Sequence, residues 1–121
     1  MSFLYNQHVL VTGGGGFIGS HLVERLISEG AKVRAFVRYN SRADIGLLKL
    51  APTSVLEQCE IVSGDLRDIH AVQKAVEGCD YVFHLGALIS IPYSYHHPLE
   101  VTQTNVLGTL NVLLACQQAG V

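Results

Sequence analysis

Residues 8–26 read HVLVTGGGGFIGSHLVERL, and this stretch decides the fold. A run with β-branched residues, typical of a strand, breaks into four glycines and then becomes a helical pattern. A glycine fingerprint indicates dinucleotide binding only in this context of strand, turn and helix. Gly13 would permit the sharp turn, Gly16 would let backbone N–H groups approach a pyrophosphate, and Gly19 would let the helix lie close to the strand. A glycine-rich turn without a ligand is the alternative interpretation.

The composition fits a single compact domain. Of the 121 residues, 49% are hydrophobic and 15% are charged, which suits an α/β protein with buried strands. The net charge of −2 argues against a nucleic-acid-binding surface. The cysteines (Cys59, Cys79 and Cys116) lie far apart without metal-ligand spacing, so we expect free thiols in a reducing compartment and no metal site. Because we find no targeting signal and no apolar run of about 18 residues, we expect a cytoplasmic protein without membrane contact.

Strand and helix patterns alternate along the chain. We expect strands over residues 8–12, 32–37, 60–62 and 80–85, and helices over 17–29, 46–50, 69–77 and 98–118. In the first helix Ile18, Leu22 and Leu26 share one face. The last helix carries a broad apolar face made of Val106, Leu107, Leu110, Leu113 and Leu114.

This alternation predicts an α/β fold of the Rossmann type. The doubly wound parallel sheet would have the strand order 3-2-1-4 and would be truncated after its fourth βα unit. Residues 1–121 would thus be the N-terminal part of a dinucleotide-binding domain. The ligand crevice would lie between the carboxyl ends of the first and fourth strands.

Residues after the second strand indicate which dinucleotide is preferred. NAD-selective sites place an acid roughly 20 residues after the last fingerprint glycine, but this chain has Arg38 there, followed closely by Asn40, Ser41 and Arg42. Guanidinium groups and small polar donors bind a 2′-phosphate through charge-assisted hydrogen bonds, whereas a carboxylate repels it. We therefore expect NADP rather than NAD. The alternative is that these arginines are solvated surface charges beside Asp44.

Four motifs together carry a family resemblance. TGGGGFIGSHLVERL, GDLRD, HLGALISIPYSY and TNVLGTLNVLLAC resemble, in order and spacing, the extended short-chain dehydrogenases/reductases, and within them the nucleotide-sugar epimerases and 4,6-dehydratases. The resemblance implies an NAD(P)-dependent enzyme that acts on a nucleotide sugar by transient hydride transfer at the sugar C4. It also implies a homodimer for the full-length protein.

The resemblance also implies roles for individual residues. Asp65 would accept from the adenine amine, Asn105 would help to hold the nicotinamide side, and Ser90 or Tyr93 would contact the sugar. Gly86 is a small departure, because the family more often has alanine there. The full set of cofactor contacts implied by the matching motifs is Gly13, Gly16, Phe17, Ile18, Gly19, Asp65, Leu66, Leu85, Gly86, Ala87 and Asn105.

The catalytic Tyr-x-x-x-Lys pair of that family is absent from this sequence. Tyr81, Tyr93 and Tyr95 are not followed four positions later by lysine. We therefore expect no catalytic residue in the chain and no turnover by the 121-residue polypeptide alone. An NADPH-dependent carbonyl reductase and a non-catalytic dinucleotide sensor remain alternative functions. His84 is interpreted as a satisfied histidine at a strand end rather than as a catalytic base.

Overall fold

The computed structural model describes residues 2–38 and 44–121. The strands of these residues form a single parallel sheet in the order β3-β2-β1-β4, so the predicted topology is confirmed. The register aligns Thr12 with Phe36 on one side and with His84 on the other, which brings the carboxyl ends of the strands to one edge. The strands are β1 (His8–Thr12), β2 (Lys32–Arg38), β3 (Cys59–Gly64) and β4 (Tyr81–His84).

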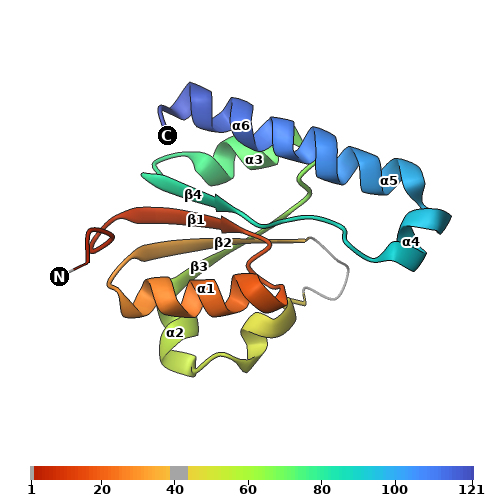
Figure 1. The fold of residues 1–121 in the computed structure, drawn as a ribbon. Helices are drawn as coiled ribbons and strands as arrows, with labels where there is room; N and C mark the ends of the chain where they lie inside the picture. The colour runs from red at the N-terminus through yellow and green to blue at the C-terminus, as the bar shows by residue number, and fades with distance from the viewer. Residues whose placement is uncertain (1, 39–43) are drawn as a thin grey trace.

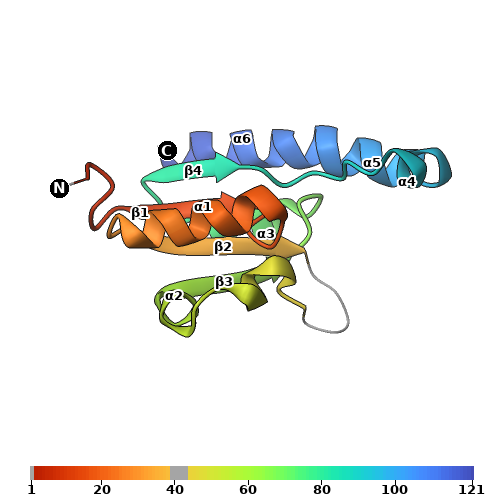
Figure 2. The same cartoon turned by 60° about the horizontal axis from the view of Figure 1, so that its bottom comes forward.

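Helices cover both faces of the sheet (Figures 1 and 2). α1 (Phe17–Ser28) and α2 (Thr53–Gln58) lie on one face, while α3 (Ile69–Val76) and α6 (Gly108–Ala119) lie on the other. The start of α3 follows the sequence prediction, because the Asp68 carboxylate accepts from the N–H groups of His70 and Ala71 at 3.0 and 3.4 Å. The chain leaves α1 through Gly30, which has a φ of 86°.

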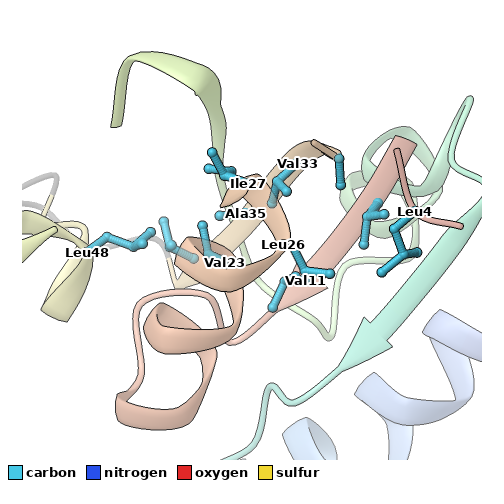
Figure 3. Packing of buried hydrophobic residues seen from close by; sticks show 11 residues of the cluster. Leu4, Val11, Val23, Leu26, Ile27, Val33, Ala35 and Leu48 are labelled. Carbon is cyan, nitrogen blue, oxygen red and sulfur yellow. The ribbon is translucent and has the colours of Figure 1, made fainter. Parts of the chain in front are cut away.

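Each face of the sheet has its own hydrophobic core. Val9 and Val11 of β1 point toward α1 and pack with Val23 and Leu26, in the cluster that Figure 3 shows. Leu10, which lies between these two valines, points the other way and packs with residues of α3 and α6. Since both faces of β1 are buried, the strand reads as a continuous apolar run rather than as an alternating one. The two cores hold β1 in the centre of the sheet.

The predicted helix over residues 98–118 is not uniform. α5 (Pro98–Thr102) passes into a π-helical turn over Gln103–Leu107 before α6 begins. Two short helices were not predicted: α2, and α4 (Ile91–His96), which precedes α5. Both are six residues long, which is too short for a 3.6-residue periodicity to stand out.

The faces predicted for two helices differ from those that are buried. Ile18 at the start of α1 is 69% exposed, and α1 buries Val23, Leu26 and Ile27 instead. In the last helix the predicted apolar face points outward, with Leu113 62% exposed. The residues that α6 buries are mostly small, which allows a close approach to α3 and to the segment after β3: Gly108, Asn111, Val112 and Ala115. No helix within residues 2–38 and 44–121 is long and apolar enough to span a bilayer.

Candidate functional site

The turn between β1 and α1 is built from backbone in close contact. Gly13 has a φ of 69°, in the left-handed region that favours glycine, and a Cβ there would lie 2.9 Å from main-chain atoms of Leu85 and Gly86. A Cβ on Gly19 would overlap the carbonyl oxygen of Gly13. The turn and the close helix approach predicted for these two glycines are therefore confirmed.

The start of α1 points backbone donors toward the same region. Its first i→i−4 hydrogen bond runs from the N–H of Ser20 to the carbonyl of Gly16, at 2.9 Å. The amides of Phe17, Ile18 and Gly19 precede that bond, and such N–H groups have no partner inside a helix. The first turn of α1 carries no acidic side chain. This end of the helix is therefore suited to an anionic group.

A cleft of about 800 Å³ opens at the carboxyl ends of the strands. This volume lies in the range of small-molecule binding sites. Most of the candidate cofactor residues line it: Gly13, Gly16, Phe17, Ile18, Gly19, Arg38, Asp65, Leu66, Leu85, Gly86 and Ala87. Asn40, Ser41 and Arg42 lie outside the described residues. Asn105, Ser90 and Tyr93 do not line the cleft.

Asp65 enters the cleft in an ion pair. Its carboxylate accepts from the Arg67 guanidinium at 2.6 Å and from the Arg67 backbone N–H at 2.9 Å. The hydrogen bonds from Arg67 hold the pKa of Asp65 below its usual range, so the group is anionic at neutral pH. The carbonyl of the next residue, Leu66, accepts from the buried Asn111 amide at 2.8 Å, and this hydrogen bond holds the Leu66 backbone in place.

The segment that follows β4 is held by two side chains. Thr12 Oγ1, at the end of β1, accepts from the N–H groups of Leu85 and Gly86, each at 3.0 Å. Asn105 binds both main-chain groups of Leu88: its Oδ1 accepts from the N–H at 2.8 Å and its Nδ2 donates to the carbonyl at 2.9 Å. Asn105 therefore shapes the wall of the cleft, and its direct contact with a cofactor stays a prediction.

His84 is partly buried, and both of its ring nitrogens are hydrogen-bonded. Nδ1 lies 2.7 Å from Thr12 Oγ1, and Nε2 lies 3.0 Å from Thr109 Oγ1. Burial lowers the pKa of His84 below its ordinary value of 6.5. The prediction of a satisfied strand-end histidine is confirmed.

Arg38 and Glu100 form an ion pair between two walls of the cleft. Arg38 ends β2, and its guanidinium donates to Glu100 of α5 at 2.6 Å. The other oxygen of Glu100 accepts from the Tyr93 hydroxyl at 2.5 Å. That hydrogen bond and the charge of Arg38 keep the pKa of Glu100 low. Tyr93 thus binds a carboxylate at the cleft, and the exposed Ser90 caps α4 by accepting from the Tyr93 N–H at 3.4 Å.

Sequence reasoning missed the site residues that act across long separations. Glu100 meets Arg38 across 62 positions and Asn111 meets Leu66 across 45, and no local pattern marks either pair. The sequence pattern predicts Thr12 only as a strand residue. Its alignment with His84 needs the register between β1 and β4, which single-strand patterns do not give.

Comparison with known proteins is consistent with this site. Residues 10–121 match the sequence family described as GDP-mannose 4,6 dehydratase. The chain belongs to the GDP-mannose 4,6-dehydratase family. The resemblance to extended short-chain dehydrogenases/reductases is thereby confirmed, and solved structures of nucleotide-sugar epimerases share the fold of this chain.

Similar proteins include both epimerases and a reductase. A UDP-glucose 4-epimerase of Rickettsia massiliae is 33% identical over 91% of this chain and 33% of its own length. A 2-alkyl-3-oxoalkanoate reductase of Stenotrophomonas maltophilia is 39% identical over 93% of this chain and 30% of its own length. The solved Thermus thermophilus UDP-glucose 4-epimerase, in complex with NAD, has a TM-score of 0.76 and 36% identity over 94% of this chain and 35% of that one. The chain thus spans about a third of the length of the relatives it matches.

Proposed function

We propose that this chain binds a nicotinamide dinucleotide, as the cofactor-binding part of a nucleotide-sugar 4,6-dehydratase or epimerase. The observation that carries the proposal is the tight turn from Gly13 to Gly19, which brings the backbone amides of the first turn of α1 to the cleft. A diphosphate fits such a cradle because backbone donors can approach it closely. The Thermus thermophilus relative, solved with NAD, supports the assignment.

Each part of the cofactor has a candidate partner in the cleft. The amides at the start of α1 would hold the diphosphate, and Asp65 would accept from the adenine amine. The backbone of residues 85–87, fixed by Thr12, would border the ribose and the pyrophosphate. At the end of β2 Arg38 would bind a 2′-phosphate, so we propose NADP as the preferred cofactor.

The chemistry would be hydride exchange with the substrate. A bound nicotinamide ring would supply a reversible acceptor for the hydride of the sugar C4. The residues of this chain would bind and orient the cofactor, since the sequence lacks the Tyr-x-x-x-Lys pair that would move the proton. Turnover would therefore need groups that these 121 residues do not supply.

A carbonyl reductase is the second candidate, favoured by one observation. Identity to the 2-alkyl-3-oxoalkanoate reductase is 39%, against 33% to the Rickettsia epimerase. Product analysis of a version that includes the catalytic pair, with a panel of UDP-, GDP- and dTDP-sugars and of simple ketones, separates the two. Net NADPH oxidation with a ketone supports the reductase, whereas sugar conversion without net oxidation supports the epimerase or dehydratase.

We also propose that the protein forms a homodimer through its last helix. The apolar side chains on the outside of that helix are between 40% and 65% exposed, and they form a surface that a second copy can cover: Val106, Leu107, Leu110, Leu113 and Leu114. Sedimentation equilibrium of the wild type and of Leu113→Glu tests this, with a dimer expected only for the wild type.

One substitution separates dinucleotide binding from folding. Ile18 lies in the first turn of α1, is 69% exposed and lines the cleft. A glutamate there interacts favourably with the positive end of the helix dipole, but it repels a diphosphate. In Ile18→Glu we expect the affinity for NAD and NADP, measured by titration calorimetry, to fall at least about tenfold while the thermal midpoint is unchanged or higher.

The matched control places the same charge elsewhere. Leu50→Glu changes a side chain that is 74% exposed and does not line the cleft, so it should leave dinucleotide affinity unchanged. A wild type that binds neither dinucleotide, or an Ile18→Glu variant that binds as tightly as the wild type, would contradict the proposed function.

A further inference from the structure

The cations of the cleft wall are already neutralised by carboxylates. Among the described residues that line the cleft, Arg38 and Arg67 are the two with positive side chains. Arg67 is paired with Asp65 and Arg38 with Glu100, each at 2.6 Å. These four charges therefore balance. A further anion that binds Arg38 must share its guanidinium with Glu100 or displace Glu100 from it.

Glu100 is the better fixed member of its ion pair. Its side chain is 22% exposed, against 62% for Arg38. One of its oxygens accepts from Arg38 and the other from the Tyr93 hydroxyl. The Tyr93 ring is held in turn by stacking on His97, with the ring centroids 4.5 Å apart and the planes 27° apart. Glu100 therefore stays near Arg38 even when the exposed guanidinium moves.

We infer that Glu100 is a specificity-determining residue that competes with a 2′-phosphate for Arg38 and so lowers the affinity for NADP relative to NAD. This inference rests on the proposed function, in which a dinucleotide lies in the cleft with its adenosine ribose near the end of β2. A 2′-phosphate on Arg38 must share or take the guanidinium from Glu100, and in either case it lies close to the anionic carboxylate, which repels it. The 2′-hydroxyl of NAD carries no charge, and a carboxylate can accept its hydrogen.

The contribution of Glu100 comes from α5 rather than from the end of β2. In NAD-selective sites the acid that binds the ribose diol normally ends the second strand. Here β2 ends with Arg38, and a carboxylate reaches the same place from the opposite wall, 62 positions later. The cofactor preference of this chain is therefore set by a pair of residues with opposing effects.

The test compares NAD and NADP affinities of the wild type and Glu100→Gln by titration calorimetry at low ionic strength. We expect the affinity for NADP to rise about three- to tenfold and that for NAD to change less than about twofold, since an ion pair with an exposed partner has a modest energy. Added salt should reduce the difference. In the background of Arg38→Gln the effect of Glu100→Gln on NADP should shrink, because the competition for Arg38 is then removed.

A matched control removes a carboxylate from another Arg–Glu pair. Glu60 binds Arg34 at 2.9 Å toward the amino ends of β2 and β3, so Glu60→Gln should leave the ratio of affinities unchanged. If Glu100→Gln binds a dinucleotide with an unaltered ratio, whether both affinities rise or neither does, the inference is overturned and the proposed function stands. If neither dinucleotide binds the wild type or any variant, the proposed function fails together with the inference.

Discussion

The hydroxyl of Thr12 donates its hydrogen to Nδ1 of His84, 2.7 Å away. The assignment follows from counting donors. Thr12 Oγ1 already accepts two N–H groups, from Leu85 and Gly86, which fills its acceptor sites and leaves its hydrogen for the ring. Nε2 of His84 must then carry a proton and donate to Thr109 Oγ1, whose own hydrogen goes to the Asn105 carbonyl at 2.7 Å.

We expect His84 to be neutral and protonated at Nε2 at pH 7. The ¹⁵N shifts of a selectively labelled protein measure this directly, with a pyrrole-like value for Nε2 and a pyridine-like value for Nδ1. A proton on Nδ1 would show that the donor count is wrong.

The stability of the fold should fall as His84 becomes protonated. Burial lowers the pKa of His84 in the folded chain below the ordinary 6.5, so between these two values the unfolded chain binds more protons than the folded chain. The stabilisation due to neutral His84 is complete above about pH 6.5 and is lost as pH falls toward the lower folded pKa. Urea unfolding at pH 7.5 and at pH 5.5 should show a larger loss for the wild type than for His84→Gln. His70→Gln, which changes an exposed histidine of α3, should lose as much stability between these two pH values as the wild type does.

Removing the Thr12 hydroxyl should destabilise the protein. Thr12 is 1% exposed, and valine has nearly its shape but lacks the hydroxyl oxygen. The Gly86 N–H then loses its partner, and the Leu85 N–H keeps only the longer hydrogen bond to the Thr12 carbonyl, at 3.3 Å. We expect Thr12→Val to cost about 1–3 kcal/mol in urea unfolding. Amide hydrogen exchange at residues 85 and 86 should also accelerate. Thr12→Ser keeps the hydroxyl, so it should protect both amides, and equal exchange in the two variants would contradict this role.

Asn105 should control the order of the chain after β4. Alanine at this position removes both hydrogen bonds to the Leu88 backbone. We expect faster hydrogen exchange at the Leu88 amide and weaker dinucleotide binding in Asn105→Ala, with a nearly unchanged thermal midpoint. Thr102→Ala, at an exposed position of α5, serves as the control. Protection of Leu88 equal to that of the wild type would refute the assignment.

Replacing a glycine should cost more stability where a Cβ would clash with the backbone than where only a positive φ requires glycine. Gly19→Ala forces a Cβ into the Gly13 carbonyl, and we expect a loss of about 3 kcal/mol or no folding at all. Gly78 has a φ of 75° but open space around it, so Gly78→Ala should cost only about 1–2 kcal/mol. Denaturant unfolding of both variants measures the difference, and equal costs would mean that the backbone of the turn can move.

The topology could be predicted from local patterns because each strand is bounded by a glycine or a polar turn. The β-branched run at Val9 and Val11 and the glycine at position 13 define a first βα unit, and the handedness of parallel crossovers then restricts the strand order. The cleft follows from that order, since the carboxyl ends of β1 and β4 must meet.

The details that could not be predicted depend on tertiary contacts. Ile18 has the spacing of a core residue, yet it faces the cleft. The first turn of α1 lies at the cleft, outside the hydrophobic core that the rest of the helix helps to form. The last helix buries Gly108 and Asn111 rather than its leucines, because close packing against Leu66 requires small or hydrogen-bonding groups. The partner of Arg38 depends on where α5 lies, which no periodicity in the sequence gives.

At the base of the cleft the turn at Gly13 meets the backbone of Leu85 and Gly86 directly, with no side chain between them. This contact is between main-chain groups, so it does not depend on which side chains the neighbouring positions carry. Diversification among related proteins would then have to use the rim, where Arg38 and Glu100 stand, and a library intended to change ligand choice should randomise the rim and keep the base intact.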